Sequence, residues 1–126
     1  MAEKIYENEW IFIEQEAADI PWLKIFTQQQ AKEMSDCDEA TQQEIFRVLL
    51  ILEKAMIRYF KPDKINIASF ANYLPRVHWH IMARYRGDSH FPEPMWGARQ
   101  READLDIPEM TGFLENLSVL LDEAGK

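Results

Sequence analysis

The most informative segment of the chain is Pro75-Arg76-Val77-His78-Trp79-His80-Ile81-Met82-Ala83-Arg84. Its alternation predicts a β-strand, because successive side chains of a strand point to opposite faces of a sheet. One face is apolar throughout and should pack under helices; it carries Val77, Trp79, Ile81 and Ala83. The other face is not committed to the core; it carries Arg76, His78, His80 and Met82. We therefore expect two imidazoles about 7 Å apart on an accessible strand face.

The segments around this strand predict an antiparallel sheet. Residues 10–14 and 22–27 are rich in Ile, Phe and Trp, and the acidic stretch between them is typical of a turn. Residues 65–70 form a further candidate strand before the histidine strand, which we expect over residues 77–85. The short link at residues 71–75 favours antiparallel pairing of these two strands.

A long helix is expected from about Asp38 to Phe60, with Ser35 or Asp36 as its cap. Apolar residues repeat there at three- and four-residue spacing, so one face should lie on the sheet. These residues are Ile45, Val48, Leu49, Leu52, Met56 and Tyr59. Three others widen the apolar sector beyond one face: Leu50, Ile51 and Ile57. That width leaves room for a second packing surface, and Pro62 should end the helix.

The C-terminal part reads as a loop followed by a helix. Residues 86–101 contain two Pro and two Gly with little periodicity, which predicts an extended loop. A final helix should start at Asp104 or Asp106, with Pro108 in its first turn. Gly112 should weaken this helix by about 1 kcal/mol relative to Ala.

Length and composition indicate one globular domain over residues 1–126. The 126 residues, 47% of them hydrophobic, fit an α+β fold with an antiparallel sheet of about five strands and two helices. The net charge of −8 argues against binding a nucleic acid polymer, which needs a basic face. The single Cys37 fits a reducing compartment, and the N-terminus lacks a signal-peptide pattern. The longest apolar run, residues 48–52, is too short to span a bilayer, so we expect a cytoplasmic protein with no membrane partner.

Two neutral imidazoles on one strand face allow two kinds of chemistry. They can ligate a metal, or one can attack phosphorus while the other contacts the phosphate or the leaving group. A zinc site needs three or four ligands, and neither His90 nor Cys37 is an obvious further ligand. We therefore expect no metal and no cofactor. From the residues alone, a solvated surface pair remains the alternative.

The segment from Asn72 to Arg84 resembles the signature of the histidine triad (HIT) family, His-φ-His-φ-His followed by apolar residues, a small residue and Arg. When Ala83 and Arg84 are matched to its end, His80 is the third histidine and His78 the middle one. Arg76 then stands where most full triads have the first histidine.

Flanking segments add to this resemblance. Residues 65–72 are similar to the family strand and phosphate loop that precede the motif. Residues 21–26 and 91–97 are similar to a bacterial subgroup that resembles dinucleoside polyphosphate hydrolases. The resemblance covers residues 8–100 and implies a HIT-like fold, with residues 101–126 as a C-terminal loop and helix.

The resemblance also implies roles for individual residues. His78 would be the nucleophile that attacks the α-phosphorus of a nucleotide conjugate and forms a nucleotidyl-histidine. The backbone carbonyl of Arg76 would accept a hydrogen bond from the second ring nitrogen of His78 and fix its tautomer. His80 would donate to the phosphate or the leaving group, while Asn72 and Ser69 would contact the phosphate.

Three further residues belong to this expected site. Glu14 is a candidate for binding the ribose hydroxyls, and Trp96 would help to complete the pocket from the C-terminal tail. The Arg76 guanidinium, about 7 Å from His78, would disfavour an imidazolium by roughly 0.6 to 2.4 kcal/mol. It could also pair with phosphate oxygens through its fork of donors.

The function implied is that of a nucleotide hydrolase or nucleotidyl transferase. Its substrates would be dinucleoside polyphosphates, nucleoside phosphoramidates or aminoacyl-adenylate-like conjugates. The alternative is a non-catalytic nucleotide-binding module that lost activity together with the first histidine. A homodimer is also implied, because family members commonly pair through the long helix and a sheet edge.

Overall fold

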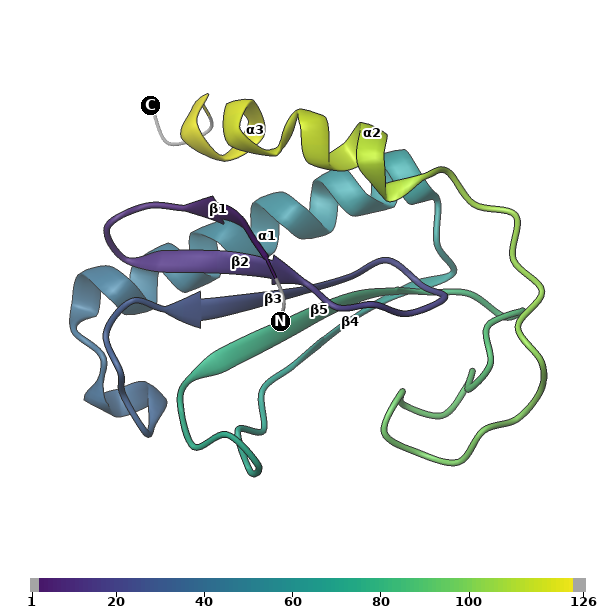
Figure 1. The fold of residues 1–126 in the computed structure, drawn as a ribbon, viewed down its shortest axis with the longest axis horizontal. Helices are drawn as coiled ribbons and strands as arrows, with labels where there is room; N and C mark the ends of the chain where they lie inside the picture. Colours follow the sequence, from purple (N-terminus) through teal and green to yellow (C-terminus); the bar gives the residue numbers. More distant parts are fainter. Residues whose placement is uncertain (1–2, 124–126) are drawn as a thin grey trace.

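The computed structural model describes residues 3–123 and contains one five-stranded antiparallel sheet. The strands lie in the order β1-β2-β3-β5-β4 (Figure 1). Their bounds are β1 Lys4–Glu7, β2 Ile11–Gln15, β3 Trp22–Thr27, β4 Lys64–Ala68 and β5 His78–Arg84. The α+β fold predicted from the sequence is thus confirmed.

The histidine strand β5 lies between β3 and β4 in this sheet. Its neighbour β3 pairs so that Phe26 lies opposite His78 and Lys24 opposite His80. Side chains alternate as predicted: Ile81 is fully buried in the core on one face, and the histidines lie on the other. The cross-strand register therefore decides which residues of β3 surround the histidines.

Helix α1, Glu39–Phe60, lies across the apolar face of the sheet (Figure 1). Its predicted sheet-facing residues are buried, with the exception of Tyr59, which is only partly buried. Phe60, the next residue, is buried in its place. The predicted cap was wrong: Ser35 and Asp36 lie in a short 3-10 turn, and Asp38 caps the helix by accepting from the Thr41 amide. The helix ends at Phe60, and the next residue, Lys61, has a φ of 49° that breaks the helical path before Pro62.

The C-terminal segment differs most from the expectation. It forms two short helices, α2 Met110–Glu115 and α3 Leu117–Glu123, which pack along α1 through Phe113, Leu117 and Leu121 (Figure 1). Residues 104–108 are not helical, because the Asp104 amide donates to Gly87 and this holds the segment along the loop. The chain thus has three α-helices in its described part rather than two.

The other differences concern strand ends and an edge strand. The short β1 has no separate sequence signal, and it forms because its backbone pairs with β2. The predicted strand at residues 65–70 ends at Ala68, and Ala71 then adopts a φ of 53° in the turn before β5. Within residues 3–123, none of the helices combines the length and apolar character needed to cross a membrane.

Candidate functional site

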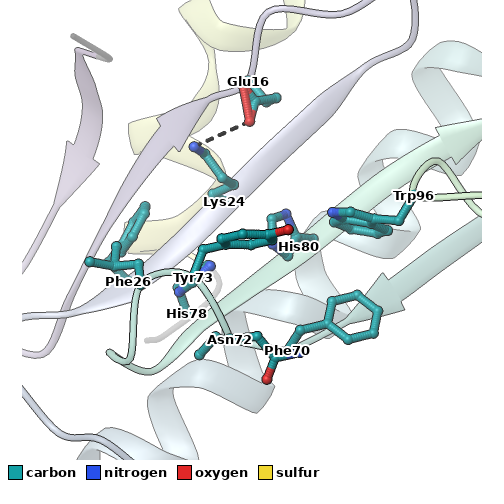
Figure 2. Close-up of a pocket in the computed structure, with 11 residues that line it drawn as sticks. Glu16, Lys24, Phe26, Phe70, Asn72, Tyr73, His78, His80 and Trp96 are labelled. Atoms are coloured by element: carbon teal, nitrogen blue, oxygen red, sulfur yellow. Dashed lines mark ion pairs between the residues drawn. The ribbon is translucent and has the colours of Figure 1, made fainter.

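A pocket of about 420 Å³ opens over His78 and His80 (Figure 2). One side is formed by β3 and the segment after β2, and the other by the turn between β4 and β5. The lining residues are Glu16, Lys24, Phe26, Phe70, Ala71, Asn72, Tyr73, Leu74, His78, His80 and Trp96. The two histidines thus share one accessible cavity with the Asn72 turn.

His78 is held in a single tautomer by the backbone. Its Nδ1–H donates to the carbonyl oxygen of Arg76, 2.7 Å away. Its ring stacks on Phe26, with 5.0 Å between ring centroids and 19° between the planes. Because Nδ1 carries the proton, the Nε2 atom of neutral His78 has a free lone pair.

His80 is held in the opposite tautomer. The indole Nε1–H of Trp22 donates to His80 Nδ1 at 3.0 Å. An indole N–H is a donor only, so Nδ1 of His80 must be unprotonated and Nε2 carries the hydrogen. The pair therefore offers a nucleophilic Nε2 on His78 and an Nε2–H donor on His80.

Burial keeps His80 neutral. The residue is 8% exposed, and its ring meets the edge of Trp96 with 4.8 Å between centroids. Burial, followed by the charges of His78 and Lys24, lowers the pKa of His80 from 6.5 to about 4. The ring centroids of the two histidines are 5.1 Å apart. This is less than the strand spacing of about 7 Å, because the rings lean together.

The Arg76 side chain lies outside the pocket lining. Its Nη2 donates to the Thr27 carbonyl at 2.6 Å, and its guanidinium lies over the rings of Phe12 and Phe26 at 5.3 and 5.9 Å. Phe12 and Phe26 stack on each other with centroids 5.0 Å apart. The guanidinium thus anchors the residue whose carbonyl fixes His78.

The other expected site residues are divided between the pocket and its surroundings. Asn72 and Trp96 line the cavity, whereas Ser69 is not part of the lining and donates from its hydroxyl to the His78 carbonyl at 2.7 Å. Glu14 pairs across the strands with Lys24 and does not line the pocket. Glu16 lies there instead and forms an ion pair with Lys24 at 3.3 Å (Figure 2).

A buried ion pair fixes the loop that carries Trp96. Arg84, 1% exposed, donates from Nε to a carboxylate oxygen of fully buried Asp88 at 2.9 Å. The Arg84 guanidinium also donates to the Glu93 carbonyl, while Asp88 accepts from the amides of His90 and Phe91. Burial raises the pKa of Asp88, but these hydrogen bonds outweigh burial and lower the pKa to about 2.

The loop that carries Trp96 covers part of the sheet face on which His78 and His80 lie. Met82 was expected on the accessible face, but it is 1% exposed and belongs to the core cluster. Trp96 from the loop packs edge-on against Trp22 and Phe70, with centroids 5.3 and 4.8 Å apart. Only the part of this face at His78 and His80 lines the pocket.

Sequence reasoning did not identify Trp22, Lys24, Glu16, Phe70 and Tyr73 as site residues. Trp22 and Lys24 lie on the same face of β3, because they are two residues apart. Only the pairing register with β5 shows that this face meets the histidines. Among residues 3–123, no group of three or more His, Cys, Asp or Glu side chains is placed to hold a metal ion.

Comparisons with known proteins bear on the fold of this chain. The family description of the HIT domain matches residues 2–87. A histidine triad protein from Bradyrhizobium japonicum is 30% identical, with a TM-score of 0.74 over 94% of this chain and 87% of that one. A second, from Marinobacter aquaeolei, is 23% identical, with a TM-score of 0.77 over 97% and 90% of the two chains. No curated protein matches the sequence.

Proposed function

Because this chain belongs to the HIT-domain family of nucleotide-binding proteins, we propose that it is a nucleotide hydrolase or nucleotidyl transferase. It acts at the α-phosphate of dinucleoside polyphosphates or nucleoside phosphoramidates through a nucleotidyl-histidine intermediate. The observation that carries this proposal is the pair of complementary tautomers. His78 offers a lone pair and His80 offers an N–H to the same cavity.

The reaction takes two displacements. The Nε2 lone pair of His78 forms a bond to the α-phosphorus, while the bond from phosphorus to the leaving group breaks and its electron pair goes to the leaving group. A phosphate leaving group departs as an anion, whereas the amine of a phosphoramidate also takes up a proton from solvent. Water then attacks the phosphorus, the N–P bond breaks, and its electron pair returns to Nε2. One proton of the water is released to solvent, and a nucleoside monophosphate leaves.

The phosphate is bound by donors on two sides of the cavity. We assign the Asn72 amide and the His80 Nε2–H to the phosphate oxygens, with Lys24 as the cationic group of the lining. Ser69 and Arg76 act indirectly, because both hold the backbone that carries His78. Trp96 forms the wall beside His80.

The test is incubation with diadenosine triphosphate or diadenosine tetraphosphate, whose leaving groups are nucleoside phosphates. We expect release of AMP and, after rapid quenching, a mass increase of one adenylyl group on the peptide that contains His78. His78→Ala should abolish both signals. His90→Ala is the matched control, because His90 lies in the loop outside the pocket lining and should leave both unchanged.

The second candidate is a nucleotide-binding module without turnover. Arg76 at the place of the first histidine favours it, because the pocket then has two histidines instead of three. Saturable AMP binding in calorimetry, with no AMP release and no adenylylated protein from any of these conjugates, would select this function.

We also infer a homodimer and a cytoplasmic location. Helix α1 exposes three large apolar side chains along one stripe: Phe46, Leu50 and Ile57, at 47%, 58% and 49%. Trp79 packs edge-on against Phe46, and its buried Nε1–H has no hydrogen-bond partner among the described residues. An apolar stripe beside an unpaired donor supports a second copy of the chain as its partner. The lone, buried Cys37 fits a reducing compartment.

A further inference from the structure

The hydrogen bond from Trp22 to His80 restricts what His80 can do. In the sheet, Trp22 lies opposite Met82, so its indole reaches diagonally along β5 to the ring of His80. His80 Nδ1 accepts this bond at 3.0 Å. If His80 gained a second proton, that proton would have to sit on Nδ1, where it would face the indole N–H. Protonation therefore requires that this bond be broken.

The surroundings of His80 act in the same direction. His78 and Lys24 lie close to it and disfavour a positive charge, and the nearest carboxylate of the lining, Glu16, is already paired with Lys24. Glu14 faces Lys24 from β2 and is not part of the lining. The aromatic ring of Trp96 covers His80 from the loop. The lowered pKa of His80 is consistent with this arrangement.

We propose that Trp22 determines the specificity of the site by keeping His80 a neutral hydrogen-bond donor instead of a general acid. The site then selects nucleotide conjugates whose leaving group departs without a proton. Such leaving groups are weakly basic anions, for example carboxylates, phosphates and acidic phenolates. Of the two substrate classes proposed above, dinucleoside polyphosphates should therefore react much faster than nucleoside phosphoramidates. Phosphoramidates release amines, and amines, like alkyl alcohols, need a proton that His80 does not supply.

The balance of the first displacement follows from this assignment. When His78 attacks, the electron pair of the breaking P–O bond stays on the leaving oxygen, which departs as an anion. The His80 Nε2–H stabilises the developing charge through a hydrogen bond and keeps its proton. This step rests on the proposed function, since it requires turnover at His78.

The first test needs no substrate and no variant. In protein with ¹⁵N-labelled histidine, long-range ¹H–¹⁵N correlation spectra should show His80 with an unprotonated Nδ1 and a protonated Nε2. This pattern should persist from pH 7 to pH 5.5. A His80 ring that is protonated on Nδ1, or that titrates near pH 6.5, would overturn the inference whatever the activity.

The second test compares aryl esters of AMP that differ in leaving-group acidity but little in size. Wild-type protein should hydrolyse the 4-nitrophenyl ester at least about 100-fold faster in kcat/KM than the phenyl ester. Trp22→Phe, which keeps the ring but lacks the N–H, should narrow this ratio at least about tenfold, since general acid catalysis contributes about 10² to 10⁴-fold. Trp10→Phe is the matched control, because Trp10 lies outside the pocket lining, and it should keep the wild-type ratio.

The outcomes separate the two proposals. Equal rates for both esters in wild-type protein would overturn the specificity while leaving the hydrolase intact. No hydrolysis of any ester, together with no adenylylated His78, would overturn the proposed function, while the spectra still decide the state of His80. If Trp22→Phe does not fold, the wild-type ester ratio and the wild-type spectra are sufficient for the decision.

Discussion

Two hydrogen bonds, one to each histidine ring, determine the chemistry of the pocket at the scale of single residues. A backbone carbonyl sets the tautomer of His78, and an indole sets that of His80. The consequence is that the two rings, although adjacent on one strand face, are not interchangeable. Exchanging their roles would require a different side chain at Trp22 and a different backbone path at Arg76.

The state of His80 gives a pH dependence of stability. Its pKa falls from 6.5 to about 4 on folding, so the unfolded chain binds more protons between these two values. The free energy of unfolding should therefore decrease by about 2 kcal/mol as pH falls from 7 to 5. Urea unfolding at several pH values checks this. His80→Gln should flatten the curve in this range, and an equally steep curve in that variant would contradict the assignment.

Arg76 should matter for stability more than for the tautomer of His78. Arg76→Ala removes the bond to the Thr27 carbonyl and the contacts with the Phe12 and Phe26 rings, at a cost of about 1 to 2 kcal/mol. The carbonyl that accepts from His78 remains. Chemical denaturation should show the loss, while ¹⁵N spectra should keep the Nδ1–H form of His78. A change of tautomer would show that the guanidinium does more than anchor the backbone.

At this scale, sequence reasoning found the residues of β5, the turn before it and Trp96 of the later loop, but not the neighbouring residues on β3. Alternation along one strand identifies His78 and His80, and the link before it identifies Asn72. Trp22 could not be identified in this way, because its contact with His80 depends on the register between two strands that are far apart in the sequence. The position of the Arg76 side chain could not be predicted from the sequence either, because it depends on the stacked rings of Phe12 and Phe26.

At the scale of elements, the 86–101 loop depends on the Arg84–Asp88 pair. Asp88→Asn keeps the shape but removes the charge that balances a buried guanidinium, so we expect a loss of about 3 kcal/mol. Amide exchange within the loop should accelerate, and Trp96 should become more accessible. Glu102→Gln is the control, because its ion pair with Arg99 is exposed and should matter by less than about 0.5 kcal/mol. Equal effects of the two substitutions would contradict this role of Asp88.

Gly112 illustrates how tertiary packing overrides helix propensity. In an isolated helix, Ala at this position should stabilise by about 1 kcal/mol. In the structure, a Cβ there would overlap the Tyr59 hydroxyl, which donates to the Glu109 carbonyl. Gly112→Ala should therefore lower the midpoint of thermal unfolding. In a Tyr59→Phe background, which removes the overlapping oxygen, the same change should raise it. The same sign in both backgrounds would exclude this explanation.

The elements differ in how well local sequence predicted them. The strand at residues 22–27 was predicted with its observed bounds, and α1 ends at the expected residue, because strong apolar patterns and Pro62 mark them. The C-terminal helix was placed too early, since Pro108 suggests a first helical turn that the contact of Asp104 with Gly87 prevents. Strand β1 depends on pairing with β2 and has little local signal of its own.

At the scale of the whole molecule, the exposed stripe on α1 makes the association state testable. We expect wild-type protein to sediment as a dimer at micromolar concentration. Leu50→Glu should shift it to the monomer without loss of helical signal, because a charge would be buried at the contact. Val119→Glu is the matched control on α3, equally exposed and outside the stripe, and it should stay dimeric. A monomeric wild-type chain would rule out this interface.

The two faces of β5 lie in different environments, and this limits which insertions the strand can accept. His78 and His80 face the cavity, whereas Trp79 and Ile81 between and after them face the helix side of the sheet. Inserting one residue after Val77 would turn every later side chain over, so that Ile81 would face the cavity and His80 the helix. A two-residue insertion would restore the alternation. Length-variant libraries of this strand should therefore recover folded clones preferentially at even insert lengths, whereas the exposed turn at residues 72–74 should tolerate odd and even inserts alike.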